Sequence, residues 1–139
     1  MKNQYDLAES WFRKGDDDIN AAEVLLRSMT SYGAACFHSQ QAIEKYLKGF
    51  IEFKGQIAPK VHDLVELNRQ CIQSGAVWKI EDEELAQTTR YAVECRYDLN
   101  FYPNEYAAKT AFLTAQRICR VVLSEYESLK SRADDQSDT

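Results

Sequence analysis

The residues best suited to binding chemistry lie in one segment, 90–103, which concentrates arginine, tyrosine and aspartate. Two Arg-Tyr pairs begin at Arg90 and Arg96, six residues apart, and Asp98 follows the second pair. A guanidinium group can hold a phosphate or a carboxylate through two parallel hydrogen bonds, and a tyrosine ring can stack on a base. We therefore expect a ligand site that includes Arg96, Tyr97 and Asp98.

A structural interpretation of the same segment is the alternative. Asp18 lies beside Trp11 and Leu25 on the first predicted helix, where a carboxylate at the edge of a core needs a cationic partner or contact with solvent. In this interpretation Arg96 pairs internally with Asp98 or Asp18, and the neighbouring tyrosines fill one end of the fold.

A second polar set recurs at three- and four-residue steps over residues 38–52, so it lies along one side of a helix. Its amide, ammonium and imidazole groups suit a phosphate or the carboxylates of a partner. A solvated helix face without a ligand is the alternative. The set consists of His38, Gln41, Lys45, Lys48 and Glu52.

Several common sites are not indicated by the sequence. Neither GxGxxG nor GxxxxGK[ST] occurs among the five glycines. His38 and His62 are the two histidines, and neither has a second His or Cys three or four residues away on the same helix face, so we expect no metal and no cofactor. The four cysteines form no CxxC pair, and we predict reduced core thiols at Cys36, Cys71, Cys95 and Cys119.

Composition and length indicate one soluble globular domain. The chain has 139 residues, 45% hydrophobic and 28% charged, with only 5 Gly and 2 Pro to interrupt regular structure. It contains no apolar run long enough to span a membrane and no secretory signal at its start, so we expect a cytoplasmic protein with no membrane contact.

The net charge of −5 hides two mildly basic segments, 38–62 and 87–120, each with two more basic than acidic residues. They would form one anion-facing surface if the fold brings them together. Their charge is much weaker than the basic stripe of a duplex-DNA-binding protein, so we expect no binding to duplex DNA.

The elements that must position these residues are helices, because apolar side chains recur with helical spacing throughout. We predict an all-α, up-and-down bundle of four to five antiparallel helices, forming a single domain over residues 1–130 with a flexible acidic tail at 131–139. Gly15 lies on the apolar stripe of the first helix, which favours the close approach of another helix. The predicted helices cover about 4–28, 34–53, 62–73, 81–96 and 103–130.

Three strings in the sequence resemble the HEPN domain family of helical domains. They are YGAACFHSQQAIEKYLK at 32–48, PKVHDL at 59–64 and RYD at 96–98, and the first helix, with Trp11 and residues 16–23, also looks like the opening of that family. The resemblance covers roughly residues 5–130. It implies a helical bundle, a homodimer, and partnership with a small nucleotidyltransferase encoded alongside. Some members of the family are metal-independent ribonucleases, and others are non-catalytic and proposed to bind nucleotides.

The ribonuclease members carry an arginine and a later histidine with four to six residues between them, and this sequence lacks that spacing. After Arg96 the corresponding residues, 101–103, are Phe, Tyr and Pro; after Arg90, residues 95–97 are Cys, Arg and Tyr. Metal-free RNA cleavage needs an acid and a base that work near neutral pH, a task for which histidine is suited and Tyr102 is not.

We therefore predict a non-catalytic, homodimeric HEPN protein of the toxin-antitoxin or defence type, which binds a nucleotide or a partner nucleotidyltransferase. One alternative is a divergent ribonuclease that uses Arg96 with a displaced histidine or with Tyr102. Another is a purely structural dimerisation module. The predicted ligand-binding residues are Arg96, Tyr97, Asp98, His38, Gln41, Lys45 and Lys48, with supporting positions at Asp18, His62 and Tyr102.

Overall fold

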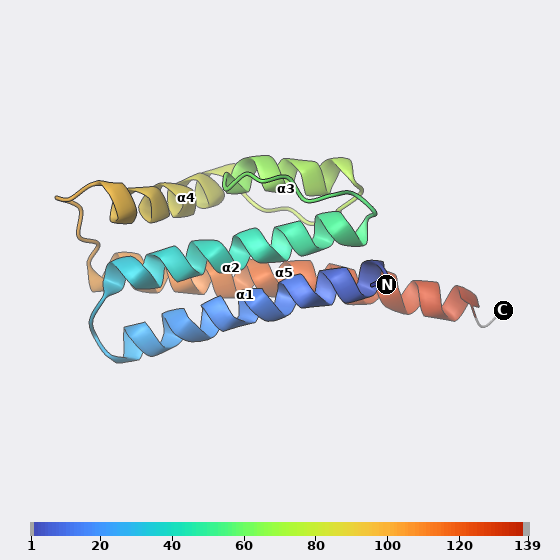
Figure 1. Cartoon of the computed structure of the whole chain (residues 1–139), viewed down its shortest axis with the longest axis horizontal. Coiled ribbons are helices and arrows are strands. Elements are labelled where there is room, and N and C mark those ends of the chain that lie inside the picture. Colours follow the sequence, from blue (N-terminus) through green and yellow to red (C-terminus); the bar gives the residue numbers. More distant parts are fainter. Residues whose placement is uncertain (1, 138–139) are drawn as a thin grey trace.

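The computed structural model describes residues 2–137 and contains five α-helices, in agreement with the predicted fold class (Figure 1). Their starts and ends agree with the sequence prediction to within two residues, except at the end of the last helix. No helix in the described part of the chain has the length and apolar character that a membrane crossing requires. The helices are α1 (Gln4–Arg27), α2 (Tyr32–Phe53), α3 (Leu64–Gln73), α4 (Asp82–Tyr97) and α5 (Glu105–Ser137).

Helix α2 lies at the centre of the bundle and packs against all four other helices. The long helices α1, α2, α4 and α5 alternate in direction along the chain, as predicted. The short helix α3 runs in the same direction as α2, and α3 and α4 follow one another along one side of α2 (Figure 1). The up-and-down alternation therefore applies to the four long helices and not to α3.

Two glycines allow α1 and α2 to pack closely. A Cβ atom at Gly15 would lie 2.7 Å from Cδ2 of Tyr46, and a Cβ atom at Gly49 would lie 2.7 Å from Cε1 of Phe12. Both distances are shorter than carbon atoms tolerate, so each helix carries a glycine where the other helix places an aromatic ring. The close approach predicted at Gly15 is confirmed.

The core has a large aromatic part and a small part made of short side chains. Phe12 stacks on Tyr46 with ring centroids 4.7 Å apart and meets Tyr126 edge-on at 5.1 Å, which joins α1, α2 and α5. At the end of the bundle where α2 and α5 begin, the second part packs these two helices together. Its buried residues are Ala35, Cys36, Ala108 and Ala111.

Helix α5 continues to Ser137, so the boundary predicted at residue 130 is wrong for the helix. Residues 131–137, predicted as part of a flexible acidic tail, are helical because acidic side chains alone do not end a helix and the segment contains no Gly or Pro. The last two residues of the predicted tail, 138 and 139, lie outside the described part of the chain.

The four cysteines are free thiols, as predicted, but they are not all core residues. Cys36, Cys71 and Cys119 are buried, whereas Cys95 is half-buried near the end of α4. Burial raises the pKa of Cys36 to about 12, so its thiol is protonated and unreactive at neutral pH.

Candidate functional site

A cavity of about 790 Å³ opens at the end of the bundle where the α1–α2 turn meets the segment 98–104 that joins α4 to α5 (Figure 1). Aromatic rings and one guanidinium group dominate its wall. We call this the aromatic cavity. It is lined by Ser31, Tyr32, Gly33, Ala34, Phe37, Cys95, Arg96, Phe101, Tyr102 and Pro103.

Local hydrogen bonds shape the segment that closes this cavity. Oδ1 of Asp98 accepts from the backbone N–H of Asn100 at 2.9 Å, and the carbonyl of Asp98 accepts from the N–H of Phe101 at 3.1 Å. Oδ1 of Asn104 accepts from the N–H of Ala107 at 2.8 Å, which caps the start of α5. The Asp98 carboxylate, predicted to bind a ligand, thus holds the turn that presents Phe101 and Tyr102.

Arg96 is exposed and lies between two aromatic rings. Its guanidinium carbon is 5.2 Å from the ring centroid of Phe37 on α2 and 5.3 Å from that of Tyr97. These distances are typical of cation–π contacts. Among residues 2–137, no carboxylate forms an ion pair with Arg96, so the internal pairing with Asp98 or Asp18 is not observed. The guanidinium group is therefore open to solvent.

A second, smaller cavity of about 120 Å³ adjoins the aromatic cavity and shares Phe37 and Arg96 with it. Its wall is formed by α2, α4 and the residues just before α3, and it includes four predicted site residues, Gln41, His62, Arg96 and Tyr97. We call this the polar cavity. It is lined by Phe37, Gln40, Gln41, His62, Thr89, Ala92, Val93, Arg96 and Tyr97.

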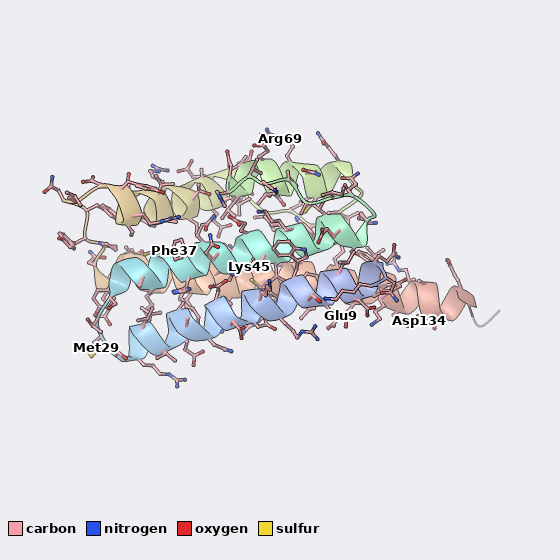
Figure 2. All side chains as sticks on the ribbon, in the orientation of Figure 1. Glu9, Met29, Phe37, Lys45, Arg69 and Asp134 are labelled. Carbon is pink, nitrogen blue, oxygen red and sulfur yellow. The ribbon has the colours of Figure 1, made fainter. Side chains whose placement is uncertain are left out.

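Two residues of the predicted polar stripe on α2 face α1. They do not face the corner between α2 and α4, where the two cavities lie. Nδ1 of His38 lies 2.8 Å from Oδ1 of Asp18, and Nζ of Lys45 donates to Oδ2 of the same carboxylate. Asp18 is buried, with 7% of its surface exposed. Figure 2 shows Lys45 near the middle of α2 and Phe37 closer to the start of that helix. The sequence predicts a cationic partner or solvent contact for Asp18. In the structure that partner is Lys45, and His38 binds the same carboxylate.

Lys48 is also internal. Its ammonium nitrogen lies 3.3 Å from Oε2 of the buried Glu44 and 5.9 Å from the ring centroid of Trp11. The Trp11 indole in turn donates to Glu52, the last member of the stripe. Of the stripe, only Gln41 lines a cavity with Arg96, because α2 is the central helix and its polar side is divided between neighbours.

The corner carries little positive charge, because most of the nearby lysines are paired. The basic segments 38–62 and 87–120 do meet here, but Lys45 and Lys48 are neutralised by carboxylates, and Lys54 lies over the Phe50 ring at 5.6 Å. Arg96 is the cation of the two segments that reaches both cavities. Among the described residues, no three His, Cys, Asp or Glu side chains are grouped as a metal site would require.

Sequence reasoning missed four residues that build this corner, namely Phe37, Gln40, Glu44 and Thr89. Gln40 and Glu44 are one helical turn apart, and Glu44 is one turn from Lys48, which is a readable signal for a polar network. The contact between Phe37 and Arg96 joins residues nearly sixty positions apart and leaves no local pattern.

The fold and this corner define a class: a small helical-bundle protein with an arginine held between aromatic rings at one end. The HEPN domain family model matches residues 8–127, and the chain belongs to the HEPN family. It is also similar to the crystal structure of TT1696 from Thermus thermophilus, with 26% sequence identity and a TM-score of 0.73, covering 84% of this chain and 96% of that one. No curated protein matches the sequence.

Proposed function

We propose that this protein is a non-catalytic HEPN module that binds a nucleotide at the corner between α2 and α4. The observation that carries the proposal is Arg96, which is exposed, has no carboxylate partner in the described part of the chain, and is held between the rings of Phe37 and Tyr97. An arginine in this setting is suited to bind an anion, because contacts with two rings restrict its side chain while its N–H groups have no hydrogen-bond partner among the described residues.

The shape of the corner suits a ligand with a flat ring and an anionic group. The aromatic cavity offers Tyr32, Phe37, Phe101 and Tyr102 for stacking, and base–aromatic stacking contributes about 1–3 kcal/mol per base. Arg96 lies at the boundary with the polar cavity and would meet the anionic end of the same ligand. A nucleotide combines both features in one small molecule.

A homodimer and a nucleotidyltransferase partner complete the proposal, and the exposed apolar rim of the corner supports an assembly face there. Tyr97, Leu99, Tyr102 and Tyr106 are 71%, 87%, 85% and 78% exposed. Large side chains gathered in this way mark interaction surfaces more often than ordinary surface. The molar mass of the protein in solution, measured by light scattering, tests the dimer: a mass of twice 16.0 kDa is expected.

A divergent, metal-independent ribonuclease is the second candidate, because one observation favours it. His62 lines the polar cavity together with Arg96, so a histidine does reach the arginine from outside the usual spacing. Against it, the residues at that spacing after Arg96 are Phe101, Tyr102 and Pro103, which supply no second group for acid–base work near neutral pH. We expect no EDTA-resistant cleavage of a mixed RNA substrate, and cleavage lost in Arg96→Ala would favour the ribonuclease.

Calorimetric titration with AMP and ATP tests the nucleotide site. Arg96→Ala is expected to weaken binding at least tenfold, about 1.4 kcal/mol, because hydrogen bonds to a charged phosphate are lost. Arg69→Ala is the matched control, since Arg69 is an exposed arginine on α3, away from the corner (Figure 2). Equal affinities of the wild type and Arg96→Ala, or no binding of either nucleotide at millimolar concentration, would contradict the proposal.

A further inference from the structure

The polar cavity is backed by a buried carboxylate that is fully engaged by hydrogen bonds. Glu44 is 4% exposed. Its Oε1 lies 2.9 Å from Nδ1 of His62 and 3.4 Å from Nε2 of Gln40, and its Oε2 lies 3.3 Å from Nζ of Lys48. A buried carboxylate with this many donors is fixed in orientation, and so are the groups that bind it.

His62 is held at two points although its side chain is 77% exposed. Its ring is bound to Glu44 through Nδ1, and its carbonyl accepts from Nε2 of Gln40 at 3.0 Å. The next residue, Asp63, caps α3 through Oδ1, which accepts from the N–H of Val65 at 3.0 Å. An exposed ring would otherwise rotate freely, so this anchoring pre-organises the imidazole.

The hydrogen bond to Glu44 also determines which ring nitrogen of His62 is left for a ligand. Because a carboxylate accepts, Nδ1 carries the hydrogen and Nε2 is the nitrogen without a partner among the described residues. Nε2 can accept from the O–H of a phosphate monoanion or, when the ring is protonated, donate to a phosphate oxygen. Both protonation states therefore suit a phosphate group.

The wall of the polar cavity combines three apolar side chains, Phe37, Ala92 and Val93, with several hydrogen-bond donors, and its described residues include no acid. Gln41, Thr89 and Arg96 contribute an amide, a hydroxyl and a guanidinium group beside the His62 ring, and none of the described residues that line the cavity is Asp or Glu. With about 120 Å³ beside an aromatic cavity of about 790 Å³, the polar cavity suits a compact anion and the larger one suits a base.

We infer that the polar cavity is a phosphate subsite, in which His62 and Arg96 contact a terminal phosphate group and Glu44 positions the imidazole. The inference rests on the proposed nucleotide binding and adds a selectivity to it: a phosphomonoester is preferred over the corresponding nucleoside. The base occupies the aromatic cavity, and the phosphate reaches past Arg96 to His62.

The test compares three probes, AMP, adenosine and inorganic phosphate, by calorimetric titration at one pH. The main variant is His62→Asn, whose side-chain amide can still donate to Glu44 but offers nothing in place of Nε2. We expect His62→Asn to bind AMP about tenfold more weakly and adenosine within twofold of the wild type. Inorganic phosphate is expected to compete with AMP but to bind more weakly. The weaker binding distinguishes a nucleotide site from a site for free phosphate.

His38→Ala is the matched control, because His38 is the other carboxylate-bound histidine and does not line either cavity. It should leave the AMP-to-adenosine preference unchanged. Equal weakening of AMP and adenosine by His62→Asn, or no weakening of AMP, would overturn the phosphate subsite while nucleotide binding that depends on Arg96 stands. If neither AMP nor adenosine binds the wild type, the proposed function and this inference fail together.

Discussion

Two contacts of α2, one with α1 and one with α4, use cationic side chains in opposite ways. Where α2 meets α1, Asp18 is 7% exposed and binds both Lys45 and His38, so every charged group has an internal partner. Where α2 meets α4, Arg96 is exposed, contacts rings, and has no ion pair within residues 2–137. Charge at a helix contact is structural when the opposing helix supplies a carboxylate, and is available for a ligand when it does not.

The packing between the helices explains this difference. Gly15 and Gly49 bring α1 and α2 so close that polar groups between them are enclosed and must be satisfied internally. Between the start of α2 and the end of α4, two cavities remain, and Arg96 lies where they join. The first contact stabilises the bundle, whereas the second leaves room for a ligand.

The largest expected effect on stability is at the α1–α2 cluster. Asp18→Ala leaves the half-buried Lys45 without its partner and should lower the free energy of unfolding by about 2 kcal/mol, measured by urea denaturation. Asp17→Ala is the control, because Asp17 is an exposed neighbour, and it should change stability by less than about 0.5 kcal/mol. Equal effects of the two substitutions would mean that the Asp18 cluster does not hold the helices together.

A smaller effect is expected at a partly buried cluster, in which Glu9 on α1 accepts from Tyr126 and Lys130 on α5 (Figure 2 shows Glu9). The hydrogen bonds from Tyr126 and Lys130 lower the pKa of Glu9 below its ordinary value of 4.5. Glu9 therefore stabilises the fold above pH 4.5, and this contribution is lost as the pH falls through the lowered value.

Glu9→Gln should accordingly cost about 1 kcal/mol at pH 7, and the difference from the wild type should shrink as the pH falls below 4.5 and through the lowered pKa of Glu9. Thermal unfolding followed by circular dichroism over this pH range measures it. Glu127→Gln, an exposed glutamate on α5, serves as the control. A cost that is independent of pH would show that Glu9 contributes packing and not charge.

Much of the fold could be predicted from the sequence because so few residues interrupt it. Helical spacing located the five helices, and Gly15 indicated a close contact before its partner was known. Neither the direction of α3 nor the length of α5 could be predicted. The first depends on which part of α2 covers α3, and the second depends on a helix end that no breaker residue marks.

The candidate site could be predicted only in part, and the polar stripe on α2 shows why. Helical spacing correctly places His38, Gln41, Lys45 and Lys48 along one side, but spacing does not tell what faces that side. Because α2 is central, His38 and Lys45 meet the carboxylate of Asp18 on α1, whereas Lys48 pairs within α2 with Glu44, one turn earlier. Which polar residues stay available for a ligand is decided by the neighbouring helices, and this information is not local.

The smallest expected effect on stability is at Arg96, and it is the sharpest test of the comparison. Arg96→Ala removes contacts with two rings, but the side chain is exposed and its ordering costs entropy, so the free energy of unfolding should change by about 0.5 kcal/mol or less. Nucleotide affinity should nevertheless fall at least tenfold in the same protein. A residue that matters for binding and not for folding belongs to a site. If Arg96→Ala instead lost about 2 kcal/mol in urea denaturation, as expected for Asp18→Ala, then Arg96 would be a structural residue, and the cationic side chains at both contacts of α2 would serve the fold alone.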